Sequence, residues 1–152
     1  MNKIIVDTNI VFSAFLNIDS KISQILINGF HQYEFYAPEY IRYEILEHQS
    51  KIKKLARLSD DEFIETYELV MRNIKVLNHK IVPFSVYEFA KKLCYEIDID
   101  DTIFIAFTEF LEGKLWTGDK KLINGLEQKG YLNWVTTEIL YADFTRQTYK
   151  NR

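Results

Sequence analysis

The chain has only five glycines, two prolines and one cysteine among its 152 residues. Collagen-like, low-complexity and many disordered chains are rich in glycine or proline, so this composition excludes those classes. The single cysteine, Cys94, cannot form an internal disulfide, and the chain has no cysteine cluster for zinc. Its place in an apolar stripe with Ala90 and Leu93 predicts a buried packing role.

Long apolar runs and a strong net charge are also absent. The longest unbroken apolar run covers Ile103 to Phe107, far short of the roughly 18 residues that span a bilayer, so we expect no transmembrane helix. An aspartate at position 7 interrupts the first apolar stretch, which is unlike a secretory signal, and the expected location is the cytoplasm. The net charge of −3 argues against a broadly basic surface that coats nucleic acid. It leaves open an acidic site that meets phosphate through a metal ion.

The sequence does contain short β-branched or aromatic runs that alternate with longer segments of helical period. This alternation predicts an α/β fold with a mostly parallel sheet of about five strands. No linker rich in glycine, proline or serine divides the chain, so we expect a single domain over residues 1–152. The expected strands are Lys3–Val6, Tyr33–Tyr36, Ile74–Leu77, Lys114–Thr117 and Trp134–Thr136.

Between the second and third of these strands the sequence predicts two helices without a strand between them. Apolar residues recur at the spacing of a helix with one buried face. The first stripe predicts one continuous helix through residues 41–55, and the second covers residues 63–71. We interpret the segment from about Glu39 to Arg72 as a helical hairpin beside the sheet. The residues of the first stripe are Ile41, Ile45, His48, Ile52 and Leu55.

Three aspartates stand at strand ends or helix starts, where an open α/β sheet keeps its ligands. Asp7 ends the run IIVD, Asp119 follows LWTG, and Asp101 opens the helical segment that contains residues 103–111. Each has an ordinary alternative, because aspartate is a preferred helix N-cap that accepts hydrogen bonds from free backbone N–H groups. For each aspartate taken singly, the sequence leaves both interpretations open.

Glu44 is the fourth acid of interest. At about 100° per residue, it lies roughly 60° from the centre of the inward stripe, on the flank of the buried face. A glutamate that only meets solvent would more often lie opposite. The alternative is a boundary glutamate paired with a nearby lysine or arginine. His48 follows four residues later, and we interpret it as a packing or hydrogen-bonding residue rather than a metal ligand.

Carboxylates that gather in one place repel each other and raise at least one pKa, unless a cation neutralises them. Ligation by oxygen alone suits Mg²⁺ or Mn²⁺. Such a site favours phosphodiester hydrolysis, because a bound ion activates water and stabilises the leaving oxygen. The chain has no Walker motif, no G-x-G-x-x-G after the first strand, no G-x-S-x-G and no H-E-x-x-H. Dinucleotide binding and serine hydrolysis therefore lack their residues.

Four blocks of sequence, read in order, resemble the PIN (PilT N-terminal) domain over Ile4 to about Tyr141. The blocks are IIVDTNIVFSAF, APEYIRYEILEH, DDTIFIAFTEF and LWTGDKKL. The resemblance implies a three-layer α/β/α fold with a central parallel sheet, and a metal-dependent ribonuclease whose acids gather in one pocket. It places these acids at Asp7, Glu44, Asp101 and Asp119, with Asp100 as the rival for the third place.

The resemblance also implies supporting roles and partners. Thr8 and Asn9 match small polar residues that orient a carboxylate or bind a metal-bound water, and Thr117 matches the polar residue two positions before the last acid. Asp100, if it is not the third acid, is left as a cap or a supporting acid. Small members of the VapC kind are toxins that a small antitoxin neutralises, so an antitoxin, an RNA substrate and a homodimer are implied.

Basic and aromatic residues supply candidates for RNA contact. Lys120 and Lys121 directly follow Asp119 and are expected to meet phosphates beside the metal pocket. Tyr40 and Tyr43 are candidates for base stacking, although packing in the core or an interface is the preferred interpretation. The sequence thus predicts a Mg²⁺- or Mn²⁺-dependent endoribonuclease. The alternatives are a non-catalytic PIN-like module that binds RNA or protein, and an RNA-processing nuclease without an antitoxin.

Overall fold

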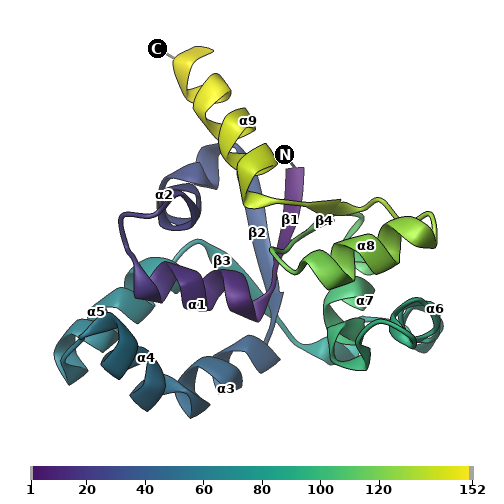
Figure 1. Ribbon diagram of the computed structural model, residues 1–152, viewed down its shortest axis with the longest axis horizontal. Helices are drawn as coiled ribbons and strands as arrows, with labels where there is room; N and C mark the ends of the chain where they lie inside the picture. The colour runs from purple at the N-terminus through teal and green to yellow at the C-terminus, as the bar shows by residue number, and fades with distance from the viewer. Residues whose placement is uncertain (1, 151–152) are drawn as a thin grey trace.

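A computed structural model describes residues 2–150 of the chain (Figure 1). Its centre is a parallel sheet with the strand order β3-β2-β1-β4-β5. All five strands lie where the β-branched and aromatic runs predict them, and their ends differ from the prediction by at most two residues. The strands are β1 (Asn2–Val6), β2 (Tyr33–Pro38), β3 (Ile74–Leu77), β4 (Lys114–Trp116) and β5 (Trp134–Val135).

Helices cover both faces of the sheet (Figure 1). One face carries α1 (Thr8–Leu16), α2 (Lys21–Asn28), α3 (Tyr40–Glu47), α4 (Gln49–Ala56), α5 (Asp60–Met71) and α9 (Thr137–Lys150). The other face carries α6 (Phe84–Cys94), α7 (Thr102–Leu111) and α8 (Lys120–Gln128). Short 3₁₀ helices are η1 (Gly29–His31), η2 (His79–Ile81) and η3 (Ile99–Asp101).

Successive residues of the central strand point to opposite faces of the sheet, as strand geometry requires. Ile4 and Val6 of β1 belong to the core beneath α1, whereas Ile5 belongs to the core beneath α7. The two cores make this a three-layer α/β/α fold, as predicted. Cys94 is fully buried in the second core, and this burial raises the pKa of its thiol to about 11. The predicted packing role of Cys94 is confirmed.

The prediction of one continuous helix through residues 41–55 is wrong. The helix α3 ends at Glu47, His48 leaves helical geometry with φ −100° and ψ 14°, and α4 begins at the next residue. The ring of His48 instead contacts Phe12 of α1 edge-on, with ring centroids 5.7 Å apart. Leu55 is 61% exposed rather than buried. The helical hairpin therefore consists of α4 and α5, and α3 is a separate helix that enters at a different angle (Figure 1).

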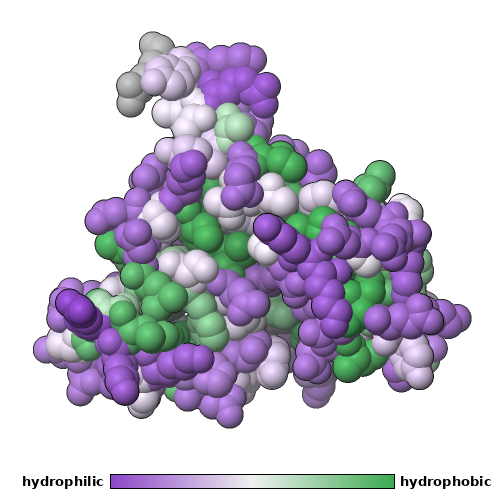
Figure 2. All heavy atoms as spheres, viewed as in Figure 1, coloured by the Kyte–Doolittle hydropathy of each residue, from purple (hydrophilic) through white to green (hydrophobic). Residues whose placement is uncertain are grey.

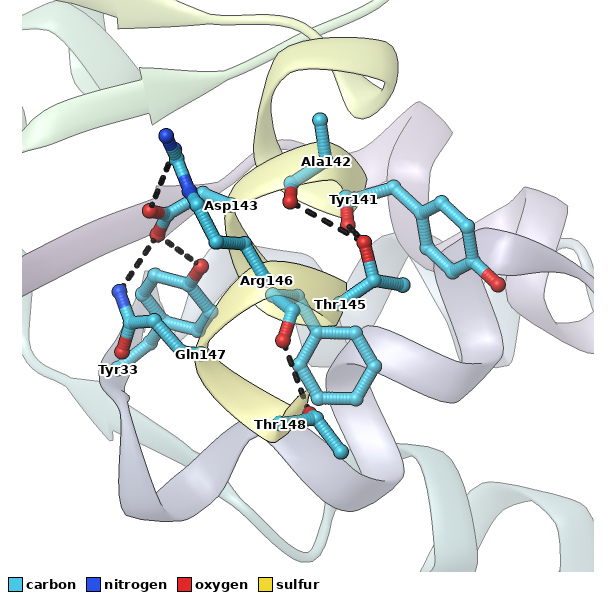
Figure 3. A network of polar contacts seen from close by, with 9 residues as sticks. Tyr33, Tyr141, Ala142, Asp143, Thr145, Arg146, Gln147 and Thr148 are labelled. Carbon is cyan, nitrogen blue, oxygen red and sulfur yellow. Dashed lines mark hydrogen bonds and ion pairs between the residues drawn. The ribbon is translucent and has the colours of Figure 1, made fainter. Parts of the chain in front are cut away.

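The helix α9 is fixed to the amino end of the sheet by a network centred on Asp143 (Figure 3). The hydroxyl of Tyr33, at the start of β2, and the side-chain amide of Gln147 both donate to Oδ2 of Asp143. Arg146 reaches the other carboxylate oxygen at 3.4 Å. The hydrogen bond from Tyr33 is the main reason that the pKa of Asp143 lies below its ordinary value. This carboxylate is therefore well satisfied.

Apolar side chains also remain on the surface. Figure 2 shows hydrophobic residues in separate groups, over α1 and α5 on one side and over α7 on the other, with hydrophilic residues between them. Within residues 2–150, no single helix has the length and apolar character to cross a membrane. The helix α1 and the segment Lys21–His31 reach that length together only across a bend of 106°.

Candidate functional site

The predicted acids lie at the carboxyl end of the sheet. Asp7 directly follows β1, and Asp119 follows the neighbouring strand β4 by a short loop. Between β1 and β4 the strand order reverses, since β2 and β3 lie on one side and β4 and β5 on the other. Open α/β sheets bind their ligands at such switch points, because the connecting loops diverge there and leave a crevice.

A pocket of about 400 Å³ opens at this place. Three of the four predicted acids, Asp7, Glu44 and Asp101, line it together. Asp119 is not among the described residues that line it. The complete lining is Asp7, Thr8, Asn9, Tyr40, Glu44, Asp100, Asp101, Ile103 and Phe104.

Asp7 is both a helix cap and a pocket residue. Its Oδ1 accepts a hydrogen bond of 3.0 Å from the backbone N–H of Ile10, which caps α1. Only 6% of Asp7 is exposed, and this burial raises its pKa from 3.8 to about 6. The negative charge of Asp119 raises the pKa further, while the capping hydrogen bond from Ile10 and the nearby hydroxyl of Thr117 oppose the rise. The cap and the functional interpretation are therefore compatible for Asp7.

Asp101 is placed differently, since it stands at the N-cap position of α7 without a side-chain capping bond. Its Oδ2 is buried and has no hydrogen-bond partner among the described residues. Burial, followed by the negative charges of Asp98, Asp119 and Asp7, raises its pKa to about 7. An unpartnered buried carboxylate oxygen is costly unless a donor or a cation reaches it. A buried carboxylate oxygen without a partner fits a role in binding a cation.

A hydrogen bond from α1 fixes Glu44. The hydroxyl of Thr8, a buried residue, donates to Oε1 of Glu44 at 2.6 Å. In residues 2–150 Glu44 makes no ion pair with a lysine or arginine, so the alternative of an ordinary paired glutamate is not found. Thr8 thereby holds the acid from α3 beside the acid at the end of β1.

Thr117, which is fully buried, lies close to both Asp119 and Asp7. The hydroxyl oxygen of Thr117 accepts the backbone N–H of Asp119 at 3.1 Å, and the proximity of this side chain lowers the pKa of Asp7. Oδ1 of Asp119 caps α8 through the N–H of Leu122 at 3.1 Å. Because its charge raises the pKa values of both Asp7 and Asp101, Asp119 belongs to the same electrostatic cluster.

The clustered acids do not form a complete set of metal ligands in this structure. In the described part of the chain, no three Asp, Glu, His or Cys side chains converge closely enough to hold a metal ion. The donor set consists of carboxylate oxygens, which are the ligands that Mg²⁺ and Mn²⁺ prefer. The residues thus fit a hard divalent cation, provided that side chains such as Asp101 and Asp119 close around it.

The two predicted RNA-contacting lysines lie outside the pocket. Lys120 and Lys121 are exposed on the first turn of α8, and Lys121 lines a separate surface hollow with Glu96 and Lys129. Asn9 is exposed at the pocket, and Asp100 lines it as well. The structure therefore brings both candidates for the third acid to the pocket, of which Asp101 is the more buried.

The exposure of Tyr40 at the pocket was not expected from the sequence. Tyr40 lines it and is 51% exposed, while Tyr43 is 71% exposed, so packing of either in the core is wrong. The available signal was the spacing, because Tyr40 precedes Glu44 by four residues and so shares its helix face. Ile103 and Phe104 also line the pocket, although the sequence analysis named them only as part of an apolar run. His48 packs on Phe12, as predicted.

Two solved structures are similar to this chain in fold. A chain in the crystal structure of VapBC2 from Rickettsia felis, bound to a DNA fragment from its promoter, is similar with a TM-score of 0.67 and 12% identity. The match covers 88% of this chain and 98% of that one. The structure of PAE2754 from Pyrobaculum aerophilum is similar with a TM-score of 0.61 and 17% identity, over 95% and 96% of the two chains. Both show the same fold.

No curated protein matches the sequence. The family pattern described as "PIN domain" matches residues 5–143, which is nearly the whole chain. The coarse functional class that this match supports is a nuclease. On this match, and with the fold to support it, the chain belongs to the PIN domain family.

Proposed function

We propose that this protein is a metal-dependent endoribonuclease that hydrolyses RNA phosphodiester bonds at the pocket of Asp7, Glu44 and Asp101. The observation that carries the proposal is the buried, unpartnered Oδ2 of Asp101, in a pocket where burial and neighbouring acids raise two carboxyl pKa values. Strongly perturbed acids that share a cleft are typical of functional sites. Membership of the PIN family supports the same function.

Mg²⁺ or Mn²⁺ is the proposed cofactor, held by Asp7, Glu44, Asp101 and Asp119. When bound, the cation supplies Lewis acidity that activates the attacking water and offsets charge at the scissile phosphate. We take Asp101 as the third acid because it is half-buried and unpartnered, whereas Asp100 is exposed. Asp100 then contributes to the negative field at the pocket mouth.

The chain's own residues prepare the site in distinct ways. Thr8 holds Glu44, and the backbone N–H of Ile10 holds Asp7, so these two carboxylates are oriented before a substrate arrives. With a pKa of about 7, Asp101 keeps part of its proton at neutral pH and releases it when a cation binds. Asn9 offers an amide to a water molecule or a phosphate oxygen. Lys120 and Lys121 offer positive charge to phosphates farther along the RNA.

We also propose that the protein is the toxin of a toxin–antitoxin module with a small antitoxin partner. The support is the likeness in fold to a chain of the VapBC2 structure. A homodimer and a cytoplasmic location remain predictions. An RNA-processing nuclease without an antitoxin would use the same acids, so the nuclease assay below applies to both roles.

The test is incubation of the purified protein with a mixed pool of tRNA, mRNA and rRNA, with Mn²⁺ or with EDTA. The Asp7→Asn variant keeps the size of the side chain and its capping oxygen but removes the charge. Asp61→Asn, on the exposed first turn of α5, is the matched control. We expect cleavage that requires both Mn²⁺ and Asp7, with 5′-phosphate and 3′-hydroxyl product ends.

Two outcomes would contradict the proposal. Cleavage that persists in EDTA and in Asp7→Asn would remove the metal site. A complete lack of cleavage, in a preparation free of any co-purified inhibitor, would favour a non-catalytic domain that binds RNA or protein.

A further inference from the structure

The mouth of the pocket carries an aromatic side chain whose exposure the fold does not require. Tyr40 is the first residue of α3 and lines the pocket, yet 51% of it is exposed. Within residues 2–150 its hydroxyl has no hydrogen-bond partner, and its ring contacts no other aromatic ring. Leaving about half of a tyrosine in water forgoes the stabilisation that burial would give. Neither core packing nor a local hydrogen bond accounts for this side chain.

The negative charges of two acids act on Tyr40. The negative charge of Glu44, followed in size by burial and then the charge of Asp100, raises the pKa of Tyr40. Glu44 belongs to α3, whereas Asp100 belongs to η3 on the other side of the pocket. Tyr40 therefore lies within electrostatic reach of acids from both elements, and it lines the pocket with a half-exposed side chain.

We propose that Tyr40 is a substrate-binding residue that stacks on an unpaired base next to the scissile phosphate. The inference rests on the proposed ribonuclease function. Phosphates are repelled by the acids around the pocket, so affinity gained from a neutral aromatic face is useful there. A lysine or arginine at this position would instead pair with Glu44 or Asp100 and compete with the cation. Every base has a face that an aromatic ring can stack on, and this contact needs no charge.

Stacking contacts and charge contacts differ in how binding depends on salt. Binding through phosphates weakens steeply as salt rises, whereas stacking on a neutral ring does not release counterions. Tyr43 gives a matched control, because it lies on the same helix and is 71% exposed but does not line the pocket.

The experiment measures kcat and KM for a short single-stranded RNA substrate at about 50 mM and about 200 mM salt. For Tyr40→Ala we expect KM to rise about tenfold to a hundredfold, by the same factor at both salt concentrations, with kcat within about threefold. Tyr40→Phe and Tyr40→Trp should restore KM, whereas Tyr40→Leu, which has bulk but no aromatic face, should not. Tyr43→Ala should keep the KM of the wild type.

A direct binding measurement separates this inference from the proposed function. The probe is a short single-stranded RNA with 2-aminopurine, added with Mn²⁺ to Asp7→Asn alone and to Asp7→Asn with Tyr40→Ala. If the wild type cleaves RNA but Tyr40→Ala keeps its KM, the inference is wrong and the nuclease stands. If the wild type does not cleave, but Tyr40→Ala abolishes fluorescence quenching and binding in this background, the stacking role stands without the nuclease. If no binding occurs, or if Tyr40→Phe binds as poorly as Tyr40→Ala, the inference is overturned.

Discussion

Carboxylates at the two ends of the sheet have opposite surroundings and opposite pKa shifts. At the amino end, Asp143 receives hydrogen bonds from Tyr33, Gln147 and Arg146, and its pKa lies below the ordinary value. At the carboxyl end, Asp7 and Asp101 are buried near other acids, and their pKa values are raised to about 6 and about 7. The first acid is part of the support that holds α9. Burial of the charged forms of Asp7 and Asp101 destabilises the fold, which is the pattern expected at a site that binds a cation.

The largest difference between the two ends is expected when an acid at each end is exchanged for its amide. Asp101→Asn should reduce RNA cleavage by about 100-fold or more, because the amide keeps the shape but lacks the charge that a cation requires. Asp143→Asn should keep cleavage within about threefold. Initial rates are compared at a temperature where circular dichroism shows both variants folded. Equal losses in the two variants would remove the distinction between the two ends.

Without metal, the buried acids at the carboxyl end should make the stability of the fold depend on pH. The folded state raises the pKa of Asp7 from 3.8 to about 6, so it holds the proton more tightly than the unfolded state. Its stability contribution is therefore present below pH 3.8 and falls as pH rises to about 6, by about 3 kcal/mol in total. Asp101, raised to about 7, extends the fall in the same direction.

We expect Asp7→Asn to have a flatter pH profile of thermal unfolding in EDTA between pH 4 and pH 8. It should also be more stable than the wild type at pH 8, since it keeps the cap on Ile10 and loses the buried charge. Excess Mn²⁺ should raise the Tm of the wild type more than that of the variant, which keeps an amide oxygen but loses the charge. A wild-type Tm that rises with pH across this window would show that these acids are not destabilising.

At the amino end the sign is reversed. The lowered pKa of Asp143 stabilises the fold above its ordinary pKa, and that stability is lost as pH falls through the lowered value. Tyr33→Phe removes the main donor and should cost about 1–2 kcal/mol at pH 7. The difference in Tm between the wild type and Tyr33→Phe should shrink at pH 3. A difference that grew at pH 3 would contradict the role given to this network.

The smallest effect is expected from the two lysines outside the pocket. Lys120→Gln and Lys121→Gln should each raise KM for RNA about two- to fivefold at low salt, and the effect should fade at high salt. This salt dependence contrasts with the salt-independent loss expected for Tyr40→Ala. Steady-state kinetics at several salt concentrations provide the measurement. An effect of either lysine that persists at high salt would point to a specific contact instead of a phosphate.

The strands and the positions of most acids were predictable from the sequence because their signals are local. A run such as IIVD marks both a buried strand and the acid at its end, and parallel strands bring such ends to one edge. Thr8, next to Asp7, was singled out by the resemblance. Its hydrogen bond to Glu44, however, spans 36 positions in the sequence and depends on how α3 packs against α1.

Two features were not predictable from local pattern. The break at His48 has no glycine or proline to mark it, and the apolar spacing continues across it, so one helix was expected where α3 and α4 lie. The contact of His48 with Phe12 is a tertiary one that helical periodicity does not register. Likewise, the exposure of Tyr40 at the pocket could not be inferred from its residue type, because it depends on how neighbouring elements pack.

The parallel pairing of β1 with β4 has a consequence for how the molecule folds. Ile4 lies opposite Lys114 in this pairing, and the contact of Tyr33 with Asp143 likewise joins residues 110 positions apart. Contacts of such long sequence separation form more slowly than those within a helix. A chain growing from its N-terminus contains Asp7 and Glu44 early, but β1 gains its second neighbour only when most of the chain has been made. The pocket at the end of β1 is thus completed late in folding.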